Sequence, residues 1–186
     1  MNSETKTNSK GLTIVELLVA VTLFSVIVAI VSDIFLVTFQ SQRRSLAFET
    51  IFDQTSFLME YMSRSLRMAR RELSVPECFS SDNLNYEITR SGRGIKFVNS
   101  DNVCQEFFLD VSTSRLKEKK ATQEQFLTST DSQVIAFGIN LLGQDQGDDL
   151  QSRVTFSLTL KRKGAKPESE PSLTVQTTLS QRRLDQ

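Results

Sequence analysis

The chain has 186 residues, with 22 basic and 22 acidic side chains, so its formal net charge at neutral pH is zero. This balance gives no general attraction to nucleic acid. The chain contains no histidine, which excludes imidazole metal sites and histidine-based catalytic triads. The length allows one modest domain beside a membrane segment.

The first predicted element is a transmembrane helix. A polar stretch, residues 1–11, ends in Lys10-Gly11, and an apolar run then extends from Leu12 to Val31 and continues to Phe39. A helix of about 20 residues spans a hydrocarbon core of about 30 Å. The run lacks Gly and Pro and is apolar on all sides, which a domain of this size could not cover.

One carboxylate, Glu16, lies near the start of this run. A charge inside a membrane span costs roughly 2.5–3.5 kcal/mol, so it indicates a function. A secretory signal would have a shorter apolar core, with a cleavage site such as residues 29–32. A simple membrane anchor fits the length of the run but leaves the carboxylate unexplained.

Residues Lys10 to Ala20 closely resemble the type IV prepilin signal. That family has a basic leader ending in Gly, an apolar first mature residue, a Thr second and a Glu fifth, and Gly11, Leu12, Thr13 and Glu16 match these places. Leu12 replaces the usual Phe. The resemblance implies that a prepilin peptidase cuts between Gly11 and Leu12 and that the new amine is N-methylated.

The same resemblance gives Glu16 a role. Leu12 and Glu16 are four residues apart and share a helix face. The new ammonium and the carboxylate can pair in low dielectric, within one chain or between neighbouring chains. In the family, this Glu recruits the amine of the next subunit. The implied partners are the peptidase/methylase, other pilin or pseudopilin subunits, an inner-membrane assembly platform and membrane lipid.

The helix is expected to continue as an amphipathic helix over residues 40–75. No Gly or Pro interrupts residues 43–73, Thr55 fills the one gap in the apolar series, and Pro76 ends the helix. The predicted buried face recurs in steps of three or four and comprises Phe48, Ile51, Phe52, Leu58, Met62, Leu66, Ala69 and Leu73.

Residues 76–186 are predicted to form a β-rich head. A hairpin with a Gly-bearing turn at 91–94 is expected over 86–98, and the last two strands alternate apolar and polar residues. Residues 115–125, 143–149 and 161–171 are interpreted as loops, the first as a loop or short helix. The fold class is therefore α+β, a long helix packed on an antiparallel sheet, with further strands expected over 103–111, 134–142, 154–160 and 173–179.

Two cysteines, Cys78 and Cys104, follow the span, and we expect them to form a disulfide if the head is exported. The alternative is two separate buried thiols. Asp145, Asp148 and Asp149 offer oxygens to Ca²⁺, but their spacing does not match an EF-hand, and a solvated acidic turn is favoured. We expect no cofactor, and no catalytic constellation indicates an enzyme.

The leader decides the expected orientation, with a single-pass helix in the cytoplasmic membrane and the head outside the cytoplasm. The pair Arg43-Arg44 argues mildly for the opposite orientation. The predicted segments are a leader (1–11), a transmembrane and assembly helix (12–39), a helix entering the head (40–75) and the head itself (76–186). After cleavage the head would belong to a surface or periplasmic filament.

The expected function is that of a structural subunit of a type IV pilus or a type II secretion pseudopilus, leaning toward a minor pilin. One alternative is a membrane-anchored protein that never polymerises and whose head binds a ligand. Another is a head that contacts DNA through basic clusters, although solvated surfaces are the favoured interpretation of each. These clusters are Arg67/Arg70/Arg71, Arg115/Lys117/Lys119/Lys120, Lys161/Arg162/Lys163 and Arg182-Arg183.

Overall fold

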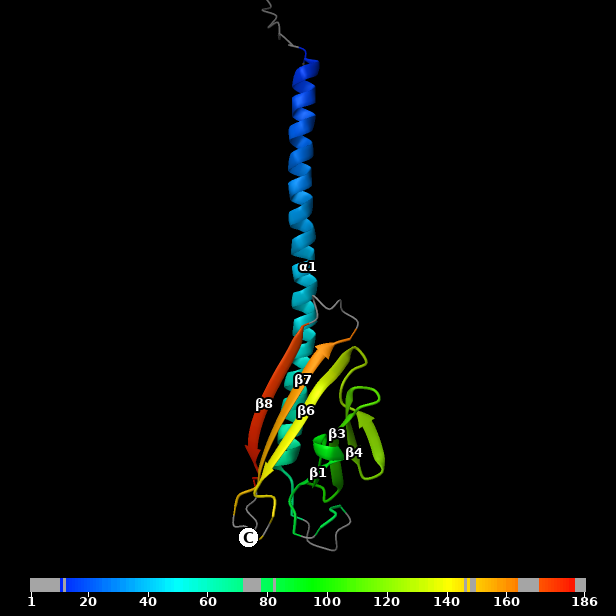
Figure 1. Cartoon of the computed structure of the whole chain (residues 1–186), viewed down its shortest axis with the longest axis vertical. Coiled ribbons are helices and arrows are strands. Elements are labelled where there is room, and N and C mark those ends of the chain that lie inside the picture. The colour runs from blue at the N-terminus through cyan, green and yellow to red at the C-terminus, as the bar shows by residue number, and fades with distance from the viewer. Residues whose placement is uncertain are drawn as a thin grey trace, which may run out of the picture. The chain divides into compact units, whose positions relative to one another are not determined.

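The chain forms one long helix followed by two antiparallel sheets (Figure 1). By internal contacts it divides into two compact units, Met1–Arg43 and Arg44–Gln186. The helix, α1 (Ile14–Arg67), contributes residues to both units. The structure is a computed structural model that describes residues 11, 13–71, 78–81, 83–145, 147, 150–163 and 171–182.

In the first unit, α1 carries the predicted transmembrane segment. It is the one helix among the described residues that is long and apolar enough to cross a membrane, with a mean hydropathy of 2.9 over its most apolar 18 residues. None of that window is buried, and its large apolar side chains face outward. An uninterrupted helix suits this environment because it satisfies its own backbone hydrogen bonds.

In the second unit, the same helix buries one face against the sheets. The predicted amphipathic character is confirmed, and Thr55 does fill the gap, with its hydroxyl donating to the carbonyl of Ile51 at 2.7 Å. Phe48 and Phe52 were wrongly placed on this face. Each of them directly follows a buried residue, Ala47 or Ile51, and its own side chain is exposed. The two rings stack on each other, with 6.5 Å between their centroids. The buried residues are Ala47, Ile51, Thr55, Leu58, Met62 and Leu66.

The helix ends at Arg67, earlier than the predicted end at residue 75, and residues 72–77 lie outside the described part of the chain. At this end of the helix, donors from distant parts of the chain bind the last helical carbonyls. The Tyr86 hydroxyl donates to the carbonyl of Leu66 at 2.7 Å, and the backbone N–H of Arg182 donates to that of Arg67 at 3.0 Å. These donors satisfy carbonyls that would otherwise lack partners at a helix C-terminus.

The first sheet has five strands in the order β1-β2-β3-β4-β5, all antiparallel. The predicted hairpin and the strand after it are confirmed, and the turn contains Gly92 at a φ of +88°, which glycine adopts without strain. The strands are β1 (Glu87–Thr89), β2 (Gly94–Val98), β3 (Cys104–Asp110), β4 (Arg115–Lys120) and β5 (Gln123–Phe126).

Residues 115–125, interpreted from sequence as a loop or short helix, instead form β4 and most of β5. The error arose because β4 is almost entirely charged. Its alternate residues Leu116 and Glu118 are nevertheless fully buried, so the strand has the usual two faces. A buried carboxylate that is paired by hydrogen bonds replaces the expected apolar residue.

The second sheet comprises β6 (Ser132–Leu142), β7 (Arg153–Arg162) and β8 (Ser172–Ser180), which lie side by side in that order (Figure 1). All three predicted strands are confirmed, and β7 pairs with β8 from Arg153 opposite Ser180 to Lys161 opposite Ser172. The alternation in β7 buries four apolar side chains, Val154, Phe156, Leu158 and Leu160.

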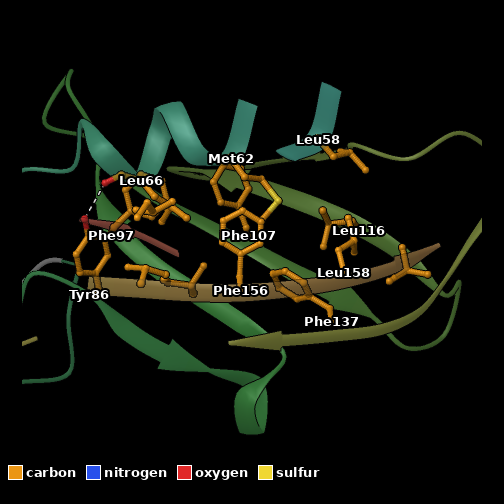
Figure 2. Packing of buried hydrophobic residues seen from close by; sticks show 14 of the residues in the cluster. Leu58, Met62, Leu66, Tyr86, Phe97, Phe107, Leu116, Phe137, Phe156 and Leu158 are labelled. Carbon is orange, nitrogen blue, oxygen red and sulfur yellow. Dashed lines mark hydrogen bonds between the residues drawn. The ribbon is translucent and has the colours of Figure 1, made fainter. Parts of the chain in front are cut away.

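Both sheets and the second half of α1 share a single hydrophobic core (Figure 2). Leu58, Met62 and Leu66 project from the helix toward aromatic side chains of both sheets. The rings of Phe97 and Phe107 lie 5.5 Å apart at their centroids. The predicted α+β head is thus confirmed, with the difference that its strands form two sheets rather than one.

Candidate assembly site

The N-terminus of α1 is built by Thr13 and Glu16. The Thr13 hydroxyl accepts a hydrogen bond from the Glu16 backbone N–H at 3.3 Å, and the Thr13 carbonyl accepts the first helical bond from Leu17 at 3.1 Å. A Thr followed three positions later by a Glu is the capping-box pattern that starts helices. Sequence reasoning missed this local role of Thr13, although the T-x-x-E spacing was there to indicate it.

The Glu16 side chain is exposed and forms no ion pair with any other residue that the structure describes. Its carboxylate also lies in the first turn, where the positive end of the helix dipole stabilises an anion. Leu12, the predicted modified residue, lies outside the described residues, and Gly11 is exposed. The arrangement leaves the carboxylate available for a partner from outside the described chain.

Other polar side chains in the apolar run are satisfied within the helix. The hydroxyls of Thr22, Ser25, Ser32 and Thr38 each donate to a backbone carbonyl three or four residues earlier, at 2.8 Å. Such bonds remove the cost of a hydroxyl in lipid. Unlike these hydroxyls, the carboxylates of Glu16 and Asp33 have no equivalent partner among the described residues.

In the head, Cys78 and Cys104 are joined by a disulfide across 26 positions. Cys104 begins β3, and Cys78 packs with Phe79 and Val98 in a small second apolar cluster. The bond therefore holds the segment that precedes β1 against the first sheet.

A polar cluster around the buried Glu118 joins α1 to the first sheet. Its carboxylate accepts hydrogen bonds from the Tyr61 hydroxyl at 2.7 Å and from the side-chain amides of Gln105 and Gln125, and the Lys120 ammonium lies 3.3 Å away. Burial raises the pKa of Tyr61, the Lys120 hydrogen bond opposes this, and the nearby carboxylate adds to the rise. Tyr61 therefore stays a neutral donor, and the cluster acts as a structural tie.

The basic cluster on β4 is largely neutralised. Lys117 forms ion pairs with Asp110 at 2.9 Å and with Glu124 at 3.8 Å. The hydrogen bond to Tyr61 raises the pKa of Lys120, and the charge of the buried Glu118 contributes further. The Arg115 guanidinium lies over the ring of Phe126, 3.8 Å from its centroid. These contacts engage Arg115, Lys117 and Lys120 without an external ligand.

The weak calcium candidate is not assembled in the described residues. Asp148 and Asp149 lie outside them, and the carboxylate of Asp145 accepts a hydrogen bond from the N–H of Gly147 at 3.0 Å. No group of three potential metal ligands occurs in the part of the chain that the structure describes.

A hollow of about 820 Å³ lies beside the end of α1 and is lined by three arginines and one acid. Glu60 pairs with Arg64 at 2.6 Å, whereas Arg67 and Arg182 have no carboxylate partner among the described residues. Arg182 was noted in the sequence only as part of a terminal basic pair, and the fold brings it to the helix end.

An N-terminal apolar helix, with a carboxylate in its first turn that has no ion-pair partner among the described residues, is joined to a helix-and-sheet head, and this arrangement fits a membrane-anchored protein. Residues 6–32 match the family model of the prokaryotic N-terminal methylation motif, which is the type IV pilin signature. The chain thus carries that signature at its N-terminus. Neither the curated proteins nor the solved structures give a significant match.

Proposed function

We propose that this chain is a structural subunit of a type IV pilus or of a type II secretion pseudopilus. The observation that carries the proposal is the position of Glu16: the otherwise apolar run 12–31 places one carboxylate in the first turn of α1, inside the methylation motif, without an ion-pair partner among the described residues. The large head, with its own core and disulfide, leans toward a minor subunit.

In this proposal each residue of the site has one task. Prepilin peptidase removes residues 1–11 after Gly11, the new amine of Leu12 is methylated, and Glu16 pairs with the amine of a neighbouring subunit. The pair forms where water is scarce, so it orients one helix against the next more strongly than a surface ion pair would. Residues 12–39 supply the assembly helix, and residues 40–75 lead into the head. Residues 76–186 form the head itself, which lies outside the cytoplasm.

Mass spectrometry of the chain isolated from its native membrane tests this proposal. We expect a mature N-terminus at Leu12 that carries a methyl group, and we expect that a Gly11→Val variant keeps residues 1–11. A native chain that still begins at Met1, or one cut near Ser32, would contradict the proposal. Either result would favour the second candidate, a non-polymerising anchor whose head binds a ligand.

For a DNA-binding head, the favourable observation is the hollow beside Arg67 and Arg182. No aromatic side chain lines it, so only phosphate contacts would act there, and binding would weaken steeply with salt. A shift assay with duplex DNA and the detergent-solubilised chain at two salt concentrations tests this. Binding that is unchanged in an Arg67→Gln/Arg182→Gln variant would exclude the hollow as its site.

A further inference from the structure

A second carboxylate, Asp33, lies in the apolar part of α1, 17 positions after Glu16. It is exposed, and no basic side chain among the described residues lies within ion-pair distance of it. Its nearest basic residue toward the head is Arg43, ten positions away, or about 15 Å along the helix. An ionisable residue in such a segment indicates a functional contact, with a partner still to be named.

The length of the apolar run shows where that partner is needed. From Ile14 to Phe39 it measures about 39 Å, whereas a hydrocarbon core is about 30 Å thick. The two acids are separated by about 26 Å, so they can lie near the two surfaces of one bilayer. Residues 34–39 then extend beyond the lipid, yet their large apolar side chains, Ile34, Phe35, Leu36, Val37 and Phe39, are all exposed. Such a patch requires a protein cover.

This apolar segment has opposite charges at its two ends, Asp33 before it and Arg43 after it. The rings of Phe35 and Phe39 stack at 6.2 Å between centroids, and the Arg43 guanidinium folds back over Phe39, 4.4 Å from its centroid. The guanidinium is therefore brought back along the helix by about four positions, or about 6 Å. It lies beside the apolar segment rather than beyond it.

We propose that Asp33 of one copy pairs with Arg43 of a neighbouring copy, with the stacked Phe35 and Phe39 packed against the neighbour's helix. The inference rests on the proposed function and adds a second intersubunit site to it. A neighbour displaced by about six positions, or about 9 Å, brings its carboxylate level with the guanidinium over Phe39. The same packing covers residues 34–39 with the apolar surface of the adjacent helix.

The faces involved make this contact heterologous. At 100° per residue, Phe39 points about 120° away from Asp33 around the helix axis, so one copy offers its carboxylate on one side and its aromatic–arginine stripe on another. A head-to-tail contact of this kind repeats into an open assembly instead of closing as a two-fold dimer. Phe39 also points about 140° away from Glu16, so this contact uses a different face from the amine pair.

Charge exchange in the full-length chain tests the inference. Two differently tagged copies are co-expressed and purified together from detergent extracts. We expect Asp33→Asn and Arg43→Gln each to reduce the co-purified copy by about ten-fold, which corresponds to a loss of about 1.4 kcal/mol in association. The double exchange Asp33→Arg/Arg43→Asp should restore it to within about two-fold. The matched control is Asp53→Asn, an exposed acid later on the same helix, which should behave as wild type.

A cross-linking experiment and a comparison with the Glu16→Gln variant distinguish the possible outcomes. A bismaleimide should link a copy carrying Asp33→Cys to one carrying Phe39→Cys, but not to one carrying Thr22→Cys. If Asp33→Asn and Arg43→Gln co-purify as wild type while Glu16→Gln does not, the inference is wrong and the proposed function stands. If the exchanged double variant associates no better than the single variants, the pairing is also wrong. If wild-type copies fail to associate at all, the inference is wrong, while the proposed function is still decided by the N-terminus of the mature chain.

Discussion

Thr13 and Glu16 show that one short stretch can start a helix and also carry an exposed charge, to which we assign the proposed intersubunit role. The hydroxyl of Thr13 caps the backbone N–H of Glu16, so the local structure depends on that N–H and not on the charge of the Glu16 side chain. A substitution that removes only the charge can therefore separate the two roles.

We expect Glu16→Gln to leave the helix start and the cleavage after Gly11 intact and to reduce assembly at least ten-fold. Glutamine is as acceptable as glutamate in a capping box but cannot pair with an ammonium ion. The measurements are the mass of the mature chain and the amount found in the filament or co-purified fraction. Thr13→Ala is the comparison, since it removes the cap and keeps the charge. Normal assembly of Glu16→Gln would contradict the role of the carboxylate.

Asp110 gives the head a predictable acid sensitivity. The Ser112 hydroxyl, the Lys117 ammonium and the Thr113 hydroxyl hold the pKa of Asp110 well below its usual value, against a smaller opposing effect of burial. The folded pKa is thus lower than the unfolded one, and the stabilisation is present above about pH 4 and is lost as the pH falls further. Asp110→Asn should therefore show a smaller loss of stability than wild type between pH 7 and pH 3.

Urea unfolding at the two pH values measures this difference, with Asp101→Asn as the control because Asp101 is an exposed acid in the turn before β3, at the other end of that strand from Asp110. A wild-type midpoint that falls no further than that of Asp110→Asn would contradict the assignment. Ser112→Ala should give an intermediate result, because Ser112 supplies one of the stabilising hydrogen bonds.

At the scale of single elements, the sequence predicts those whose side chains alternate or repeat regularly. The pattern of β7 is apolar at every second position, and all four apolar residues are buried. β4 shows the opposite case, since its buried Glu118 is satisfied by Tyr61, Gln105 and Gln125 from three other elements. The sequence pattern of β4 alone does not show that these distant residues will satisfy a buried carboxylate. The end of α1 was missed for the same reason, because its carbonyl partners come from Tyr86 and Arg182.

The contribution of β7 to the core can be measured with a pair of adjacent substitutions. Leu158 is fully buried and contacts the shared core, so Leu158→Ala should lower the free energy of unfolding by about 2–5 kcal/mol. Thr159→Ala, on the other face, should cost less than about 1 kcal/mol, since its hydroxyl only bonds Thr174 at the exposed surface. Equal effects in urea unfolding would mean that the two faces of β7 are wrongly assigned.

For the whole molecule, every described residue of the hydrophobic core lies at or after Ala47. The described apolar residues of the first unit contribute nothing to this core, and Met1–Arg43 and Arg44–Gln186 are separate compact units. We expect a chain that begins at Arg44 to be soluble and to fold with its disulfide formed. Near-ultraviolet circular dichroism and thiol labelling measure this, and a fragment that labels at both Cys78 and Cys104 would contradict it.

We also expect the disulfide to contribute to the free energy of unfolding of this fragment. A loop of 26 residues corresponds to about 3–4 kcal/mol in the chain-entropy model. Replacing both cysteines in that fragment by serine should therefore lower its unfolding free energy by a similar amount, as measured by urea denaturation. An unchanged midpoint would mean that the bond stabilises only the small cluster around Phe79 and not the head.

The attachment of the last strand to the end of the helix has a consequence for biogenesis. Arg67 and Arg182 are joined through their backbones, and the side chain of Gln181 donates to the carbonyl of Ala69 at 3.1 Å. Contacts so distant in sequence form only after the intervening chain has been synthesised. A chain that ends before Ser172 therefore lacks β8 and leaves one edge of β7 without its partner strand. Under the proposed function, proteases can remove such a product before it enters a filament.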